Sequence, residues 1–283
     1  MQRRLFLCSM PLLGGGLGAC VQAPPVARAS ANSAIADFDL TLAEANRSAA
    51  FDSARGLREL DFRDNDLTES QTSMRGRRSE RRIHPRAIDL IVSAEITSRA
   101  RYERAFRRPI WPGGRSGVTI GLGYDLGFVS PRAFEDHWQD LLTPSQIADL
   151  RPACRLQGAT AQAQLASFKD VVVDWAPAEK QFQRFLPYVI AETENTFPNC
   201  ADLSEMSLGA LVSLVYNRGS NTNKLIPRRV HMYQCKVAMQ ERKFHLIPGY
   251  LREMKVLWAN EKDARGLLVR RDLEARLFEA GLS

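Results

Sequence analysis

The chain is poor in the residues that build metal centres and disulfide frameworks. Its 283 residues include only 5 cysteines and 4 histidines. No two cysteines form a Cys-x-x-Cys pair, and no two histidines have the spacing of a helical zinc site. We therefore expect neither a metal ion nor an organic cofactor.

Long apolar runs are also scarce. Apart from residues 5–17, no stretch approaches the roughly 18 apolar residues that cross a bilayer. Hydrophobic residues make up 45% of the chain and charged residues 25%, which are ordinary values for globular proteins. This composition excludes wholesale disorder, a collagen-like fibre and a multi-span membrane protein.

Acidic residues are in the minority, and the net charge is +7. Residues 20–85 balance ten arginines against ten acids, whereas residues 86–283 hold 27 basic and 22 acidic residues, an excess of five. Such a basic body suits an anionic polymer or an anionic membrane, and by charge alone also nucleic acid.

The N-terminus has the three parts of an export signal. Arg3 and Arg4 precede the apolar residues 5–17, and a small-residue stretch, Leu-Gly-Ala, ends directly before Cys20. Three consecutive glycines at 14–16 argue against a buried helix here. The segment resembles a bacterial lipoprotein signal and also a twin-arginine motif. We predict that residues 1–19 are removed and that Cys20 is acylated, which would place the protein in the periplasm or at the outer membrane.

Residues 20–85 are predicted to form a flexible tether behind this lipid anchor. Pro24, Pro25 and the run of Ala, Ser and Asn up to Ala36 lack hydrophobic periodicity, and the basic end, residues 75–82, is too polar to offset the entropy of ordering it. A short helix is expected around residues 42–60. The basic end is interpreted as a solvated linker, with contact to anionic lipid or wall polymer as the alternative.

Three cysteines would remain in the oxidising compartment that export implies, namely Cys154, Cys200 and Cys235. One disulfide and one unpaired thiol is the outcome expected there. The sequence leaves open which pair forms.

Residues 86–283 are predicted to form an α+β domain, mostly helical, with a small hairpin after the first helix. Ile88, Ile91 and Val92 have helical spacing and lead to Glu95. Turn-forming residues 111–117 precede the β-rich run 118–124. Helical spacing then returns around residues 208–215, 250–258 and 269–277, with Gly219 as the expected stop of the first of these helices.

Three stretches occur in order along this domain: Ala94-Glu95 with Tyr102 and the run Thr119-Ile120-Gly121-Leu122-Gly123; residues 209–219; and residues 266–271 with Glu274. Together they resemble the phage-type lysozymes, the muramidases that cleave peptidoglycan. The resemblance implies a lysozyme-like fold over residues 86–283 and hydrolysis of the β-1,4 bonds of glycan strands.

One departure from that family concerns the second carboxylate. The phage enzymes carry an aspartate between the glutamate and the strand, whereas residues 96–118 contain Glu103 as their only acid. Asp125 instead follows the strand, which is similar to the pesticin-like branch. The resemblance then implies that Glu95 protonates the leaving oxygen, Asp125 activates water or stabilises the oxocarbenium ion, and Thr119 orients the water, with inversion of configuration favoured. Asp125 as a plain turn residue is the competing interpretation.

Five further side chains are candidates for contact with the glycan: Tyr102, Trp111, Tyr124, Asn217 and Arg218. Core packing is an equally good interpretation for the aromatic residues, and Arg218 also suits the end of a helix dipole. Arg270 and Arg271 are interpreted as structural ion pairs. Glu192 and Glu194 form a rival acid pair, which we interpret as a solvated helical face.

The predicted protein is thus a lipid-anchored peptidoglycan hydrolase whose partners are glycan strands and a membrane, and not nucleic acid. Two alternatives remain. A lytic transglycosylase needs only one acid and makes an anhydro product. A wall-binding lipoprotein without activity would keep the helices but not the acid pair, and the absence of aspartate in residues 96–118 keeps this alternative open.

Overall fold

The computed structural model describes residues 31–53, 74, 76–113, 116–261 and 264–282. The α-helices are α1 (Ala31–Arg47), α2 (Ala50–Ser53), α4 (Pro85–Ile96), α5 (Arg99–Ala105), α6 (Pro131–Trp138), α7 (Pro144–Leu150), α8 (Gly158–Gln164), α9 (Trp175–Thr196), α10 (Glu205–Arg218), α11 (Val230–Gln240), α12 (Ile247–Glu253) and α13 (Arg265–Ala280). The strands are β1 (Thr119–Ile120) and β2 (Tyr124–Asp125). Short 3-10 helices are η3 (Leu126–Phe128), η4 (Arg151–Ala153), η5 (Leu165–Phe168), η6 (Cys200–Asp202), η7 (Pro227–Arg229), η8 (Phe244–Leu246) and η9 (Met254–Trp258).

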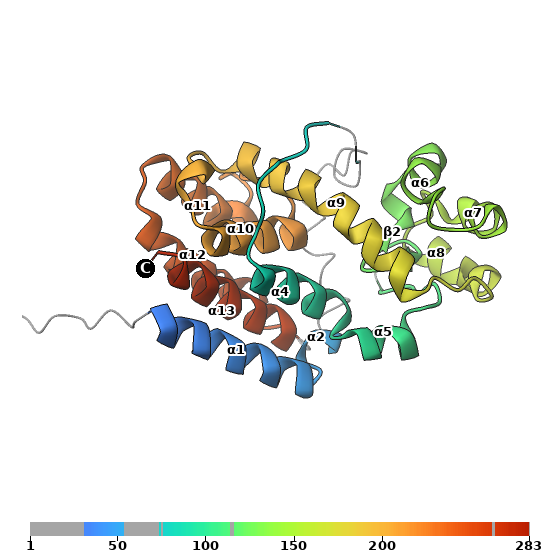
Figure 1. Cartoon of the computed structure of the whole chain (residues 1–283), viewed down its shortest axis with the longest axis horizontal. Coiled ribbons are helices and arrows are strands. Elements are labelled where there is room, and N and C mark those ends of the chain that lie inside the picture. The colour runs from blue at the N-terminus through green and yellow to red at the C-terminus, as the bar shows by residue number, and fades with distance from the viewer. Residues whose placement is uncertain (1–30, 54–73, 75, 114–115, 262–263, 283) are drawn as a thin grey trace, which may run out of the picture.

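The fold is mostly helical with one small antiparallel sheet, which confirms the predicted α+β class. The two strands pair with Thr119 opposite Asp125 and Ile120 opposite Tyr124. In Figure 1, α10 to α13 lie toward one end of the molecule, β2 of the hairpin and α6 to α8 lie at the other, and α4 and the long helix α9 lie between them.

The helices that the periodicity predicted are present. The first predicted helix is α4, and residues 208–215 lie inside α10, which ends at the expected stop, Gly219. Residues 250–258 are divided between α12 and η9, and residues 269–277 lie in α13. These segments form the helical end of the domain, where α10 packs against both α4 and α13.

The expectation of a flexible tether is corrected for residues 31–53. These residues form α1 and α2, and both helices pack against α13. Phe38 and Phe51 are almost completely buried in that contact. Phe38, Leu42 and Ala45 have helical spacing within α1, so the sequence did carry the apolar face that packs here. Each of the two aromatic rings removes a large apolar area from water.

Residues 76–84, at the end of the predicted tether, lie in an extended conformation along the helical body. The Ser79 N–H donates to the carbonyl of Pro187 in α9 at 3.0 Å, and the Ser79 hydroxyl donates to Glu194 at 3.1 Å. Arg81 donates to the carbonyls of Cys200 and Leu203. The polar residues that indicated a solvated linker are thus used in hydrogen bonds, and Glu194 is not part of a solvated face.

The predicted disulfide is also corrected, because Cys154, Cys200 and Cys235 are all free thiols. They belong to different parts of the fold: Cys154 follows η4, Cys200 begins η6 and Cys235 lies in α11. All three are buried, and burial raises the pKa of each thiol to about 12. They therefore act as small hydrophobic side chains in the core.

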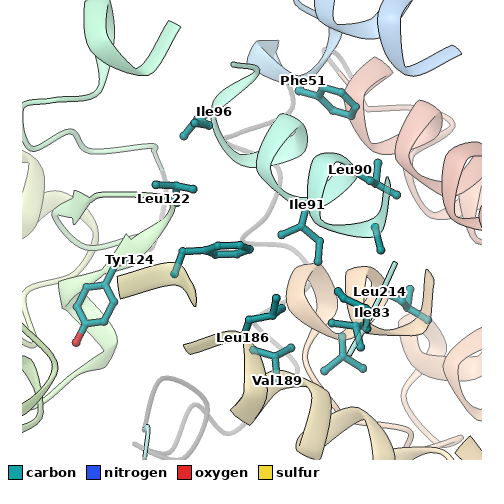
Figure 2. Close-up of a cluster of buried hydrophobic side chains, with 14 of the residues drawn as sticks. Phe51, Ile83, Leu90, Ile91, Ile96, Leu122, Tyr124, Leu186, Val189 and Leu214 are labelled. Atoms are coloured by element: carbon teal, nitrogen blue, oxygen red, sulfur yellow. The ribbon is translucent and has the colours of Figure 1, made fainter. Parts of the chain in front are cut away.

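One continuous core joins the two ends of the molecule. Figure 2 shows Leu90, Ile91 and Ile96 along α4, with Leu122 of the hairpin turn on one side and Leu186 of α9 on another. The hairpin and the helix that carries Glu95 thus contribute to the same hydrophobic core.

The predicted leader, residues 1–19, and the predicted acylation site Cys20 lie outside the described residues. Within the part of the chain that the structure describes, no helix has the length and apolar character needed to cross a membrane. The same residues contain no group of three or more His, Cys, Asp or Glu side chains placed to hold a metal ion.

Candidate active site

Glu95 lies on the buried face of α4, one residue before the helix ends. The helix begins with Pro85 at its first position, and the His84 side chain accepts a hydrogen bond from the N–H of Arg86, so the start is fixed locally. Ala87, Ile91 and Glu95 are four residues apart and all buried, which places the carboxylate on the face that packs against the rest of the domain.

The Glu95 carboxylate is part of a buried ionic network. One Arg270 Nη lies 3.3 Å from Glu95 Oε1, and Arg270 Nε lies 3.3 Å from Glu274 Oε1. Glu274 also pairs with Arg271 at 3.0 Å and accepts a hydrogen bond from Ser213 at 2.7 Å. Two arginines and two glutamates balance in charge, which makes their common burial possible. The expected structural ion pairs of Arg270 and Arg271 are confirmed, and one partner of Arg270 is Glu95 itself.

Thr119 is held in the small sheet between two backbone neighbours. Its backbone N–H and carbonyl both bond to Ile110 on one side, at 2.8 and 3.0 Å, and Asp125 is its neighbour on the other side. The turn between the strands contains Gly121 and Gly123, both with positive φ, of 57° and 81°. The short run of glycines therefore allows the chain to reverse directly beside Thr119.

Glu95 and Thr119 line one pocket. Its empty volume is about 360 Å³, part of it open to solvent, and its walls are completed by residues from the end of α4, the end of α5 and the hairpin: Ile96, Phe106, Ile110, Pro112, Gly121 and Gly123. The glutamate is only 4% exposed. The two predicted catalytic residues, 24 positions apart in sequence, are brought to one cavity.

Asp125, the third predicted catalytic residue, is tied to the backbone of its own hairpin. Its carboxylate accepts from the N–H of Gly117, at 3.0 and 3.1 Å, and from the N–H of Gly127, at 2.8 Å. It also caps η3. Cross-strand partners in a sheet point to the same face, so Asp125 lies beside Thr119. It is not among the residues that line the pocket.

Four of the five candidate glycan-contacting residues turn out to be core residues. The Tyr102 hydroxyl donates to the carbonyl of Val173 at 2.9 Å, and burial raises the pKa of Tyr102. Tyr124 lies 2.7 Å from a His137 ring nitrogen, and burial raises its pKa as well. Asn217 and Arg218 are both 0% exposed. All four side chains are buried, with at most 7% exposure, and packing is the physical reason for their presence.

Trp111 is the exception among the five. It is half-buried, its ring N–H donates to the carbonyl of Ser116 at 2.9 Å, and its neighbours Ile110 and Pro112 both line the pocket. The ring is therefore anchored at one edge beside the pocket, and the predicted stacking on a sugar remains a prediction for this residue.

Two contributions to the site were missed by sequence reasoning. Arg270 was expected to form ion pairs, but the sequence offered no signal that its partner lies 175 positions earlier. Phe106 and Ile110 form the apolar wall of the pocket, and they carry no motif that distinguishes them from other apolar residues. For Phe106 and Ile110 the available signal was the turn at residues 111–117, which indicated that the preceding segment folds back toward the hairpin.

Comparison of the chain with models of known protein families and with curated proteins finds no match.

Proposed function

We propose that this protein is a peptidoglycan hydrolase, a muramidase with a lysozyme-like domain, that cleaves the β-1,4 glycosidic bonds of glycan strands. The observation that carries the proposal is the pocket shared by Glu95 and Thr119. A glutamate at the end of a buried helix faces a glycine-rich hairpin, and the resemblance in sequence to muramidases assigns catalytic roles to these same two positions.

The arrangement suits general acid catalysis at a glycosidic oxygen. A proton donor in a pocket with limited water access is the requirement for protonating such a leaving group. Glu95 lines such a pocket beside Ile96 and Phe106, and its carboxylate also pairs with Arg270 at 3.3 Å, so it acts as the donor in its protonated form. Thr119 supplies a hydroxyl on the opposite wall, where a water molecule or a sugar hydroxyl can be oriented. Asp125, beside Thr119, is the proposed base.

A lytic transglycosylase is the second candidate, and the position of Asp125 favours it. The three backbone hydrogen bonds to this carboxylate give it a structural role that needs no catalysis. If Asp125 acts only as a cap, Glu95 is the one acid left for the reaction, and it lines the pocket. A single acid is sufficient for a transglycosylase, in which a hydroxyl of the substrate takes the place of water.

The proposal includes export and lipid anchoring at Cys20, which would bring the domain to the cell wall. It is supported by the small residues before Cys20 and by the five excess positive charges of residues 86–283, which suit an anionic polymer. The Cys20→Ser variant should leave the membrane fraction, whereas the wild-type protein stays in it. An equal distribution of the two would contradict the anchor.

The activity is tested by digesting purified peptidoglycan with a chain that begins at residue 21, so that α1 and α2 are included. Mass spectrometry of the products separates the candidates. A muramidase yields fragments with a reducing end, while a transglycosylase yields fragments lighter by one water. Intact glycan strands that nevertheless retain the protein would indicate a wall-binding protein without activity and would contradict the proposal.

A further inference from the structure

The helix that carries Glu95 ends in a strained turn. Thr97 has φ 68° and ψ −52°, and the Ser98 N–H donates to the carbonyl of Ile96 at 2.8 Å. A hydrogen bond between residues i and i+2, with these angles at the residue between them, defines the rare form of the γ-turn. Thr97 is β-branched, and a positive φ is a genuine outlier for such a residue. This conformation requires support from the surroundings.

The support comes from the N-terminal helices. The Thr97 hydroxyl donates to the Asp52 carboxylate at 2.9 Å, and Arg101 pairs with the same carboxylate at 3.3 Å. Asp52 lies on α2, which is fixed by the burial of Ala50 and Phe51. One carboxylate thus joins the end of α4 to the start of α5 from a segment 45 residues earlier.

The residues on either side of this turn form the pocket. Ile96 and Glu95, directly before Thr97, both line it, and Phe106 follows directly after α5. The direction in which the chain leaves α4 therefore affects where Glu95, Ile96 and Phe106 lie in the pocket. A second contact, from Asn46 to Ser93 at 3.1 Å, holds the preceding turn of α4 to the same N-terminal segment.

We propose that Asp52 is a positioning residue, which holds Thr97 in its γ-turn and thereby sets the place of the Glu95 carboxylate in the pocket. The inference rests on the proposed function for its catalytic consequence. Residues 31–53 would then be part of the working enzyme and not only a connection to an anchor. A small displacement of a proton donor lowers turnover more than it lowers binding of the substrate.

Four single variants and the Asp52→Ala/Thr97→Val double variant test this role in the chain that begins at residue 21. Asp52→Ala and Thr97→Val each remove one side of the hydrogen bond, Thr97→Ser keeps the hydroxyl, and Asp39→Ala is the control. Asp39 pairs with Arg86 at 2.8 Å, so the control breaks another contact between the N-terminal segment and α4, at the end away from Glu95.

Asp52→Ala and Thr97→Val are each expected to lower kcat about tenfold, with KM within about twofold, because the donor is misplaced by a fraction of an ångström to about 1 Å. The double variant should lose no more than either single variant. Thr97→Ser and Asp39→Ala should keep the wild-type kcat. Wild-type kcat in Asp52→Ala, or an equal loss in Asp39→Ala, would overturn the positioning role.

A second readout needs no activity. The α- and β-carbon chemical shifts of Thr97 and the coupling between its amide and α protons report its φ. In Asp52→Ala the shifts and the coupling should change to values typical of a negative φ. In Asp39→Ala they should stay at the wild-type values. A wild-type protein that cleaves no peptidoglycan would contradict the proposed function, and these spectra would still decide whether Asp52 holds the turn. An unchanged φ in Asp52→Ala would overturn the inference.

Discussion

Two carboxylates of the site are held in opposite ways. Glu95 is buried and bonded to a side chain of α13, which lies 175 positions later in the sequence. Asp125 is half-exposed and bonded to backbone N–H groups within eight positions of itself. The first depends on the packing of several helices, while the second depends only on the shape of one hairpin.

This difference predicts how each side of the site responds to change. A contact between distant elements is lost when either element shifts, so the environment of Glu95 should be sensitive to substitutions in α10 and α13. A cap made of local backbone groups survives such shifts. Substitutions at Asp125 should therefore have effects that stay within the hairpin.

The largest effect is expected for Glu95→Gln. The amide has nearly the same shape but cannot donate the proton, so cleavage of peptidoglycan should fall about 10²- to 10⁴-fold at a temperature where the variant is folded. The melting temperature should fall as well, because Arg270 loses a charged partner inside the buried network. Glu103→Gln is the matched control, because Glu103 is exposed and pairs with Arg99 on its own helix. Initial rates of turbidity loss compare the two variants. Equal rates for both would contradict the assignment of the acid.

Arg270→Met should give the next largest effect. It leaves the buried carboxylates of Glu95 and Glu274 without their shared partner, which is expected to cost about 3–5 kcal/mol of unfolding free energy. Arg276→Met, on the same helix, breaks a half-exposed pair with Asp37 and should cost only about 0–1 kcal/mol. Urea unfolding curves measure both. Similar losses would show that the buried network contributes no more than a surface pair.

Asp125→Asn separates the two candidate functions. The loss of a charged acceptor should destabilise the hairpin by about 1.5–3 kcal/mol whichever function is right. As the base of a muramidase, Asp125 would also contribute about 10²- to 10³-fold to the rate. As a cap in a transglycosylase, it would contribute little to the rate at temperatures where the variant is folded. Asp140→Asn, an exposed change, is the control for both measurements.

Gly209→Ala is expected to have the smallest effect. A Cβ at this position would lie 2.4 Å from the Cβ of Ala87, so α10 and α4 must move apart. We expect a loss of about 1–3 kcal/mol and a lower rate, because α4 carries Glu95. Gly249→Ala, in α12, meets no atom within 4 Å and should instead gain about 1 kcal/mol from helix propensity. A gain in both variants would contradict close contact between α4 and α10.

Local features of the fold could be predicted from the sequence. Ile88, Ile91 and Val92 indicated the helix before Glu95, and Gly219 indicated where a later helix ends. The helix is nevertheless rotated relative to that stripe, since Ala87, Leu90 and Glu95 are buried while Ile88 is only half-buried. Helical spacing finds the element, whereas the neighbours α10 and α13 decide which face is covered.

Contacts between distant segments could not be predicted. Nothing in the polar stretch around Asp52 indicated that its carboxylate would meet Thr97, and the cysteine count indicated a disulfide where three separate buried thiols occur. Tyr102 and Tyr124 have the residue type that stacks on sugars, but burial decided their role. In each case residue chemistry allowed two uses, and the choice depended on packing that no local pattern encodes.

The most direct test of the account is whether Glu95 acts as a proton donor to a leaving group. The measurement compares wild type with Glu95→Gln on peptidoglycan and on a glycan fragment that carries a nitrophenyl group, which departs without protonation. The account predicts that the rate ratio falls from about 100 or more on peptidoglycan to less than about 10 on the nitrophenyl substrate. The same large ratio on both substrates would contradict it.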